Sequence, residues 1–321
     1  MVLRQREYSG LLLIGDAHLA SRTPGYRKDD YPETVLGKVE WCLEYAREEK
    51  LLPVFLGDLF HYARDNATWL LVELIRLFSE PVLAIFGNHD VSTTGRLTSS
   101  DSLAVLVEAG RVQLVNADAP WVGQLGPISV LIGGSSYGEE IPRRLDKARY
   151  GVSADTKVIW LTHHDVRFRG YEEGGRFGPF AIEGVDIAVN GHIHRPLPSA
   201  QAGQTLWLNP GNITRLSRGE ASMREPQVTE LRWDDGWQVC TRVVPHKPFA
   251  EAFYELDELE EVQLGESEFI HGLEMLERVR TDDGTGLLGF IERNSEVLGD
   301  ERVYAEIRRL AEEVIASEHR A

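Results

Sequence analysis

The sequence predicts an α/β fold in which several strands end at one functional edge. Five short runs rich in Leu, Ile and Val have the length of buried strands, and polar side chains follow each of them at once. Side chains just past such strands stand at the carboxyl edge of a sheet. In α/β proteins, sites are assembled there because the loops can vary without disturbing the core.

The predicted elements follow one another along the chain. The five buried strands are expected at residues 11–14, 54–56, 82–86, 158–161 and 185–189. A helix is expected at 34–49, between the first two strands. Three further strands are expected at 205–208, 228–233 and 237–244. The last two are joined through Asp234-Asp235-Gly236, which is a strong hairpin signal.

A domain boundary is predicted near Pro245 and Pro248, after the last strand. We expect one large domain over residues 1–248 and an acidic helical region over 249–321. In the second region the composition shifts to Glu, Leu, Arg and Ile, with apolar residues at helical spacing around 269–276 and 303–314. Such apolar stripes either dock on their own domain or bind a partner.

The composition favours a cytoplasmic protein. Hydrophobic residues make up 42% of the 321 residues, which is ample for a core. Cys42 and Cys240 lie far apart without a CxxC pattern, so we expect inert thiols in a reducing compartment. The apolar run at 11–14 is too short for a signal peptide or a membrane span, and no membrane association is expected.

Metal-binding side chains follow each of the five buried strands. Asp, His and Asn offer oxygen and imidazole nitrogen atoms, which suit Mn, Fe or Zn better than a structural cysteine-rich site would. Glycines at four strand exits permit close approaches that let the next side chain turn into a crowded centre. The islands are Asp16-Ala17-His18, Gly57-Asp58-Leu59-Phe60-His61, Gly87-Asn88-His89-Asp90, Thr162-His163-His164-Asp165 and Gly191-His192-Ile193-His194.

These side chains are too numerous for one ion. If Asp58 bridges, two ions about 3.5–4 Å apart can clamp a phosphate and lower the pKa of water towards roughly 7. Phosphoryl hydrolysis is the chemistry that follows. Each island alone could be a polar turn, but five in this order disfavour that explanation. His163 and His164 remain alternatives, because strand alternation points only one of them inward.

The motifs D-x-H, GDxxH, GNHD, H and GHxH resemble the calcineurin-like metallophosphoesterase superfamily over roughly the first two-thirds of the chain. The resemblance implies a four-layer αββα sandwich of two facing sheets flanked by helices, with the helical C-terminal region as an appendage. It implies a first ion held by Asp16, His18, Asp58 and His194. It implies a second ion held by Asp58, Asn88, His163 and His192. By the same resemblance, His89 protonates the leaving oxygen or stabilises the transition state.

The string Gly57-Asp58-Leu59-Phe60-His61-Tyr62-Ala63-Arg64 is similar to SbcD-type DNA-repair nucleases, the bacterial and phage relatives of the meiotic-recombination-eleven family. The resemblance implies that His61 assists cleavage and that DNA is the substrate. It implies two divalent cofactor ions, with Mn expected ahead of Fe or Zn. A second copy of the chain and an SMC-like ATPase are the protein partners it suggests. Because the chain is short for this family, we expect the DNA-capping domain and the ATPase-docking tail to be reduced or missing.

The net charge of −17 is unevenly distributed. Residues 251–321 contain 20 acidic and 7 basic residues, which leaves −4 for residues 1–250. The planar guanidinium group of arginine suits phosphate oxygens, and several arginines along one edge can bind a phosphate backbone. Arginines on loops can also simply be exposed to solvent. The basic residues near the motifs are Arg22, Arg27, Lys28, Arg64, Arg167, Arg169, Arg176, Arg195, Arg215, Arg218 and Arg224.

Two other classes of function remain open. A phosphatase or phosphodiesterase acting on a small molecule or a phosphoprotein would use the same centre. A binding scaffold with a degenerate centre is disfavoured, because no position of the ligand set is missing. Rates on DNA and on small phosphate esters separate the first two classes, and the metal content of the purified protein tests the third.

Overall fold

The computed structural model describes residues 7–24, 27–92, 95–172, 174–216, 223–254 and 308–309. The chain separates into two units, residues 1–253 and 254–321, and the architecture described below belongs to the first. Of the predicted C-terminal helices, only residues 308 and 309 are described, and they are helical. The rest of those helices lies outside the described residues, so the predicted organisation of 249–321 stays a prediction.

The first sheet has six strands in the order β12-β11-β1-β2-β3-β4. Strands β1 to β4 are mutually parallel, whereas β11 and β12 run antiparallel to their neighbours. The β11–β12 hairpin turns at 234–236 as predicted, with Asp235 at a φ of 51°. The bounds are β1 Gly10–Ile14, β2 Leu51–Phe55, β3 Val82–Ala84, β4 Val112–Leu114, β11 Gln227–Trp233 and β12 Trp237–Val243.

The second sheet also has six strands, in the order β5-β6-β7-β8-β10-β9. Strands β6, β7, β8 and β10 are parallel, and antiparallel strands close both edges. The bounds are β5 Trp121–Leu125, β6 Ile128–Ser135, β7 Lys157–Thr162, β8 Ile187–Asn190, β9 Leu197–Ala202 and β10 Thr205–Asn209. Both sheets therefore contain a parallel centre whose carboxyl edge can carry site loops.

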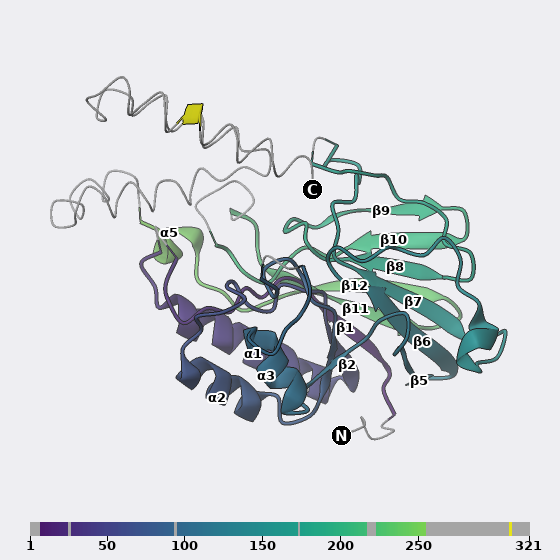
Figure 1. Ribbon diagram of the computed structural model, residues 1–321, viewed down its shortest axis with the longest axis horizontal. Coiled ribbons are helices and arrows are strands. Elements are labelled where there is room, and N and C mark those ends of the chain that lie inside the picture. Colours follow the sequence, from purple (N-terminus) through teal and green to yellow (C-terminus); the bar gives the residue numbers. More distant parts are fainter. Residues whose placement is uncertain are drawn as a thin grey trace, which may run out of the picture. The chain divides into compact units, whose positions relative to one another are not determined.

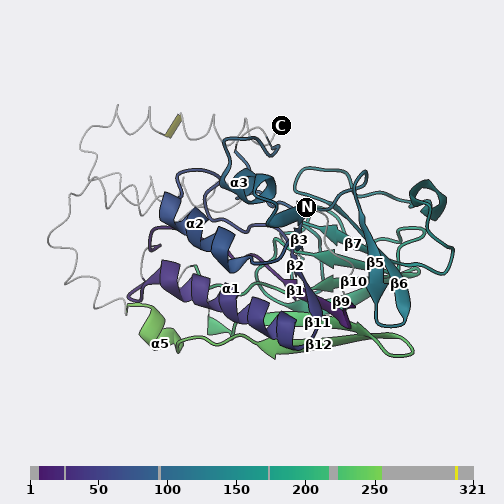
Figure 2. The ribbon, with the colours of Figure 1, turned by 90° about the horizontal axis from the view of Figure 1, so that it is seen from below.

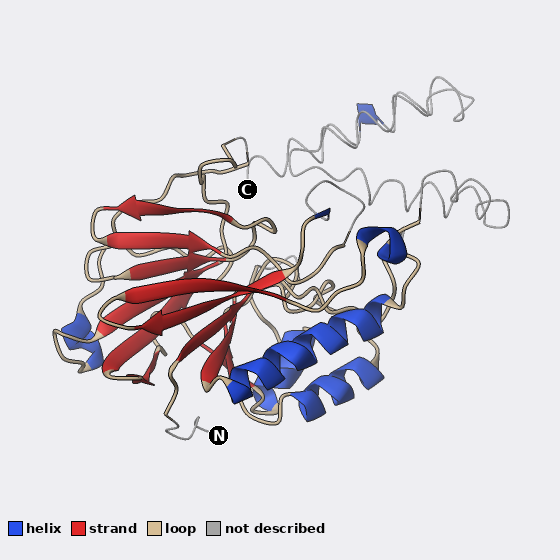
Figure 3. Ribbon diagram, turned by 180° about the vertical axis from the view of Figure 1, so that it is seen from behind, coloured by secondary structure: helices blue, strands red, loops and turns tan. Residues whose placement is uncertain are grey.

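The described helices are α1 Tyr31–Glu48, α2 Thr68–Leu77, α3 Ser102–Glu108, the 3-10 helix η1 Lys147–Tyr150 and α5 Phe249–Ala252. Helix α1 begins where the Asp30 carboxylate accepts from the Glu33 N–H, with Pro32 in the first turn. Figures 2 and 3 show α1 and α2 on the same side of the first sheet. None of the helices in the described part of the chain is long and apolar enough to cross a membrane.

Alternating side chains of the central strands build two cores on either side of the first sheet. On β1, Leu12 and Ile14 pack with Val35 of α1 and Leu70 of α2. The intervening Leu11 and Leu13 pack with residues of the second sheet. A third apolar cluster lies on the outer face of the second sheet around Trp160 and Trp207. The predicted α/β sandwich of two facing sheets with flanking helices is confirmed (Figure 1).

Candidate metal centre

Five loops bring the predicted donor side chains together at the carboxyl edges of both sheets. The loops after β1, β2 and β3 come from the first sheet, and those after β7 and β8 come from the second. Main-chain hydrogen bonds tie the first two loops, because the N–H of His18 donates to the Asp58 carbonyl at 2.9 Å. The side chains that sequence reasoning grouped from five distant segments are thus neighbours in space.

A first group of donors consists of Asp16, His18, Asp58 and His194, whose ligand atoms lie within 4.8 Å of one another. The Nε2 atoms of His18 and His194 are 3.0 Å apart, and the His194 Nε2 lies 3.5 Å from Asp16 Oδ2. That oxygen is buried and has no hydrogen-bond partner among the described residues. A buried carboxylate oxygen beside two converging imidazole nitrogens fits a divalent cation.

A second group consists of Asp58, His163 and His192, which also lie within 4.8 Å of one another. The amide oxygen of Asn88 completes it, at 3.3 Å from His163 Nε2 and 3.1 Å from His192 Nδ1. Imidazole nitrogens and carboxylate or amide oxygens, without thiolate, suit first-row divalent ions. The donor set therefore fits a second ion next to the first.

Asp58 belongs to both groups and faces each with the same oxygen. Its Oδ2 lies 3.8 Å from His18 Nε2 and 3.3 Å from His163 Nε2. Its Oδ1 accepts a hydrogen bond from the main-chain N–H of His89 at 2.8 Å. The carboxylate is held from one side, and its other oxygen stands between the two groups, which is the geometry of a bridging ligand.

The backbone at the site adopts unusual conformations. Asp16, His18, Asp58 and His192 have φ of 25°, 47°, 47° and 68°, the left-handed region that side chains other than glycine rarely enter. Such conformations cost free energy and concentrate at functional sites, where the surrounding structure enforces them. Four of the seven proposed ligands share this feature, so the loops are shaped for the site.

Two glycines leave room for the ligands. A Cβ on Gly87 would collide with the Asp58 side chain, and one on Gly57 would collide with the His163 ring. Gly57 also has a φ of 97°. Both positions require glycine because the ligand side chains approach the main chain closely. Glycine at these strand exits is thus explained by crowding, as the sequence indicated.

Hydrogen bonds fix which nitrogen of His163 and of His192 faces the centre. His163 Nδ1 donates to the Leu56 carbonyl at 2.8 Å, which leaves Nε2 towards the donor group. His192 Nε2 donates to Asp165 Oδ1 at 2.8 Å, which leaves Nδ1 towards Asn88. Outer partners of this kind orient metal-binding imidazoles and set their tautomers.

His164 points away from the donor groups. Its Nε2 donates to the main-chain carbonyl of Glu139 at 2.8 Å, and its own N–H donates to Asn190 Oδ1 at 3.1 Å. His163, in contrast, is fully buried and reaches Asp58 and Asn88. Of the two alternatives that the sequence left open, only His163 enters the cluster.

Protonation at the site favours cation binding. Burial lowers the pKa of His18 well below its usual value and that of His194 to about 3, so both imidazoles are neutral with a free lone pair. Burial, together with the negative charge of Asp58, raises the pKa of Asp16. The repulsion between the buried carboxylates decreases when positive charge enters the site, and a divalent ion supplies such charge.

His89 and His61 lie beside the first donor group and form a stacked pair. Their ring centroids are 5.3 Å apart with an interplanar angle of 14°, and His89 Nδ1 donates to the His61 carbonyl at 2.8 Å. His61 Nδ1 lies 3.5 Å from His18 Nδ1. Helix α2 has Ala67 as its N-cap residue, with no side-chain cap, so His61 does not cap this helix.

Asp90 and Asp165 support the site in ways that the sequence analysis did not assign. The Asp90 carboxylate accepts from the N–H groups of Gly87, Phe60 and Leu59 at 2.9, 2.9 and 3.2 Å, which locks the loops after β2 and β3 together. Asp165 orients His192. The only signal was their position inside the motifs, because the N–H groups of Leu59 and Phe60 and the ring of His192 come from other loops.

Some basic residues near the motifs are buried and others are exposed, and residues of both kinds bond to groups of the loops. Arg27 and Arg215 are buried, and Arg27 pairs with Asp29 at 2.6 Å. Arg64 pairs with Asp101 at 3.0 Å, and Arg224 donates to the His194 carbonyl. These arginines stabilise loops, and Arg218 lies outside the described residues. The exposed ones are Arg22, Lys28, Arg64, Arg167, Arg169, Arg176 and Arg195. Of these, Arg176 also pairs with Asp165, and Arg167 and Arg195 donate to the carbonyls of Gly175 and Gly170.

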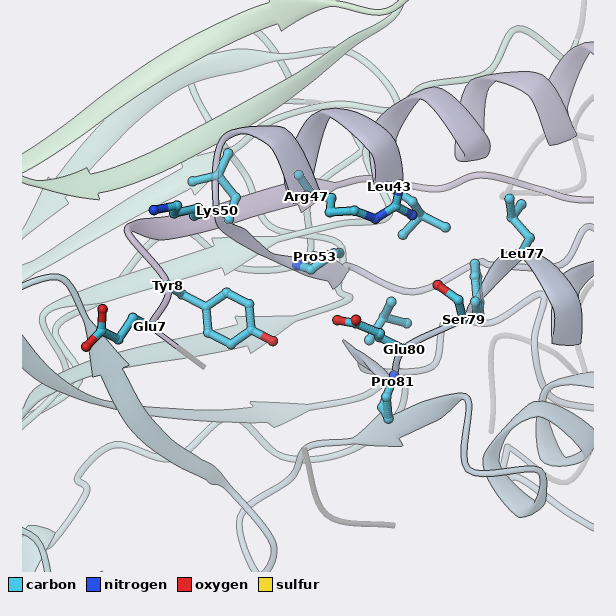
Figure 4. Close-up of a pocket in the computed structure, with 14 residues that line it drawn as sticks. Glu7, Tyr8, Leu43, Arg47, Lys50, Pro53, Leu77, Ser79, Glu80 and Pro81 are labelled. Carbon is cyan, nitrogen blue, oxygen red and sulfur yellow. The ribbon is translucent and has the colours of Figure 1, made fainter. Parts of the chain in front are cut away.

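A separate hollow lies at the edge of the first sheet where strands begin, whereas the donor loops follow the strand ends. Figure 4 shows the residues that line this hollow. It has a volume of about 110 Å³ and lies where β2 and β3 begin, next to the ends of α1 and α2. Tyr8, Arg47, Pro53 and Glu80 are among its lining residues. None of the seven donor side chains lines it, so the candidate site is the loop cluster.

A family model described as calcineurin-like phosphoesterase matches residues 10–196. This range is more than half of the chain and contains all five motifs, so the protein belongs to the calcineurin-like phosphoesterase family. It is a phosphoesterase by family, and the geometry above gives it the donor groups of a two-ion centre. No curated protein sequence matches the chain.

Solved structures with a similar chain trace have low sequence identity. A sulfate thiohydrolase, SoxB, from Thermus thermophilus is 15% identical over 81% of this chain and 60% of its own, with a TM-score of 0.43. A hypothetical protein from the same organism is 16% identical over 73% of this chain and 99% of its own, with a TM-score of 0.44. A predicted phosphoesterase from Streptococcus pneumoniae is 15% identical over 75% of this chain and 93% of its own, with a TM-score of 0.33.

Proposed function

We propose that this protein is a dimetal-dependent DNA nuclease of the SbcD type, hydrolysing phosphodiester bonds in repair or recombination. The observation that carries the two-ion part is the single Asp58 oxygen shared by two groups of donors. When bound, two divalent ions supply Lewis-acid stabilisation of the phosphate and a water of lowered pKa. Mn is the proposed ion, with Fe and Zn as alternatives that the same side chains would hold.

The residues of this chain divide the remaining work. Asp16, His18, Asp58 and His194 would hold the first ion, and Asp58, Asn88, His163 and His192 the second. His89 is fixed by the hydrogen bond from Nδ1 to the His61 carbonyl. In the imidazolium form its Nε2–H would therefore give the proton to the leaving oxygen, which leaves a neutral imidazole with its proton on Nδ1. Burial and main-chain hydrogen bonds around Asp90 keep these groups in place without rearrangement.

A DNA substrate is supported by three features. The first is the string from Gly57 to Arg64, which resembles the nuclease subgroup. The second is the position of its histidine, His61, next to His18 and His89. Exposed basic side chains stand on the loops around the centre and can contact neighbouring phosphates. A second copy of the chain, an SMC-like ATPase partner and a cytoplasmic location stay predictions of the sequence.

The test compares substrates on one preparation. Single- and double-stranded DNA, bis-p-nitrophenyl phosphate and p-nitrophenyl phosphate are each incubated with and without Mn²⁺. We expect metal-dependent cleavage of DNA and slow turnover of the monoester. Fast monoester turnover without DNA cleavage would favour a phosphatase instead, and a protein that purifies without bound metal and stays inert with Mn²⁺ would be a scaffold.

His61→Asn tests the subgroup assignment. We expect bound metal to be unchanged, because His61 is outside both donor groups as proposed, whereas DNA cleavage falls by about 10² or more, the loss typical of a group aimed at developing charge. Metal content, melting temperature and single-turnover cleavage are measured on the same sample. A lower melting temperature with full turnover in the folded fraction would show that His61 is only structural.

A further inference from the structure

We propose that Tyr62 and Arg22 form a stacking platform for an unpaired nucleobase next to the scissile phosphate. The preferred substrate would then be single-stranded DNA or a frayed end. This inference rests on the proposed nuclease function and concerns the part of the substrate that extends beyond the ions.

The two residues stand on loops that are fastened to each other. Arg22 is on the loop after β1, and Tyr62 is on the loop after β2. The N–H of Leu19 donates to the Leu59 carbonyl at 2.8 Å, and the N–H of His61 donates back to the Leu19 carbonyl at 2.9 Å. This short ladder holds both loops at fixed relative positions, so the platform is built before a substrate arrives.

A chain of rings connects Tyr62 to the centre. The Tyr62 ring packs edge-on against His61 with centroids 4.5 Å apart, and the His61 ring lies 5.4 Å from that of His18. His18 in turn presents its Nε2 to the first donor group. Only the His61 ring therefore lies between Tyr62 and the proposed metal ligand His18 in this chain of contacts. A nucleotide whose phosphate is bound at the ions extends its sugar and base over a region of this kind.

The chemistry of the pair suits a base. Tyr62 is 37% exposed, and the guanidinium carbon of the exposed Arg22 lies 6.0 Å from its ring centroid. Aromatic rings and arginine planes bind the faces of bases in single strands without reading their identity. A base inside a duplex already stacks on its neighbours and has to be extruded first. The platform thus favours substrates whose base next to the cleaved bond is unpaired.

The experiment is a double-mutant cycle between Tyr62 and the base. Two single strands carry one cleavable phosphodiester, flanked either by a normal base or by an abasic residue, and KM is measured in Mn²⁺. We expect Tyr62→Leu to raise KM about tenfold or more on the strand with the normal base. The abasic strand should raise the KM of the unchanged protein by a similar factor. Tyr62→Leu on the abasic strand should then raise KM little beyond either change alone. Tyr62→Phe should restore the normal value.

Trp69→Leu is the matched control, because Trp69 is also exposed, at 46%, but lies on α2 and belongs to neither donor group. Equal losses for Tyr62→Leu on both strands would overturn the platform. If the unchanged protein hydrolyses p-nitrophenyl esters but neither strand, the nuclease function itself fails. The platform is then tested by comparing inhibition by thymidine monophosphate with inhibition by inorganic phosphate. If the nucleotide inhibits more strongly than phosphate, and Tyr62→Leu removes this difference, the platform is supported. Equal inhibition by the two compounds overturns it.

Discussion

Asp58→Asn is expected to abolish hydrolysis and to reduce bound metal from about two ions per chain to one or fewer, because a neutral amide cannot balance two divalent charges. The local geometry sharpens this expectation. Both carboxylate oxygens are in use, since Oδ1 accepts from the His89 N–H and Oδ2 faces His18 and His163. An amide has only one acceptor oxygen, so one of the two positions would receive an NH₂ group instead.

The measurement for Asp58→Asn is metal analysis together with turnover on DNA and on bis-p-nitrophenyl phosphate. Asp155→Asn is the matched control, because it makes the same chemical change at an exposed position of the chain. The control should keep both ions and full turnover. An Asp58→Asn protein that retains two ions and normal activity would refute the shared-ligand arrangement.

The candidate site was predictable from the sequence because its signals are local. Each donor follows a strand that the apolar runs at 11–14, 54–56, 82–86, 158–161 and 185–189 announce, and each of these runs corresponds to a strand of the structure. The Cβ collisions expected at Gly57 and Gly87 show why glycine stands at these exits. Short motifs encode such a site well, because the chain enters and leaves it within a few residues.

Elements defined by distant partners were not predicted. Strand β6 contains Gly133 and Gly134, which interrupt the apolar pattern, yet these glycines leave space for Trp160 of β7 and Ile85. The contacts that explain these glycines come from residues far away in the sequence.

The roles of the arginines near the motifs also depend on partners that are distant in the sequence. A sequence cannot distinguish an arginine that faces a substrate from one that holds a loop, because the distinction depends on which acceptor lies nearby. Arg27 is buried and its guanidinium bonds Asp29 and the Arg215 carbonyl, whereas Arg22 is exposed beside Tyr62. The prediction of basic loops was therefore correct in position but too broad in function.

His89→Ala is expected to keep both ions and to lower DNA turnover by about 10²–10⁴, the range typical of a lost general acid. Metal should remain because the link between this residue and Asp58 is its main-chain N–H, which alanine retains. The imidazole itself is placed by the bond from Nδ1 to the His61 carbonyl. Loss of the side chain therefore removes the proton donor and leaves the donor groups intact.

The leaving group separates acid catalysis from other roles of His89. A p-nitrophenolate leaves without being protonated, so His89→Ala should lose much less turnover on bis-p-nitrophenyl phosphate than on DNA. His246→Ala is the matched control, because His246 also donates from Nδ1 to a main-chain carbonyl, that of Val244, at 2.8 Å. Equal losses on both substrates would mean that His89 stabilises the phosphate rather than protonating the leaving oxygen, and loss of metal would make it a ligand.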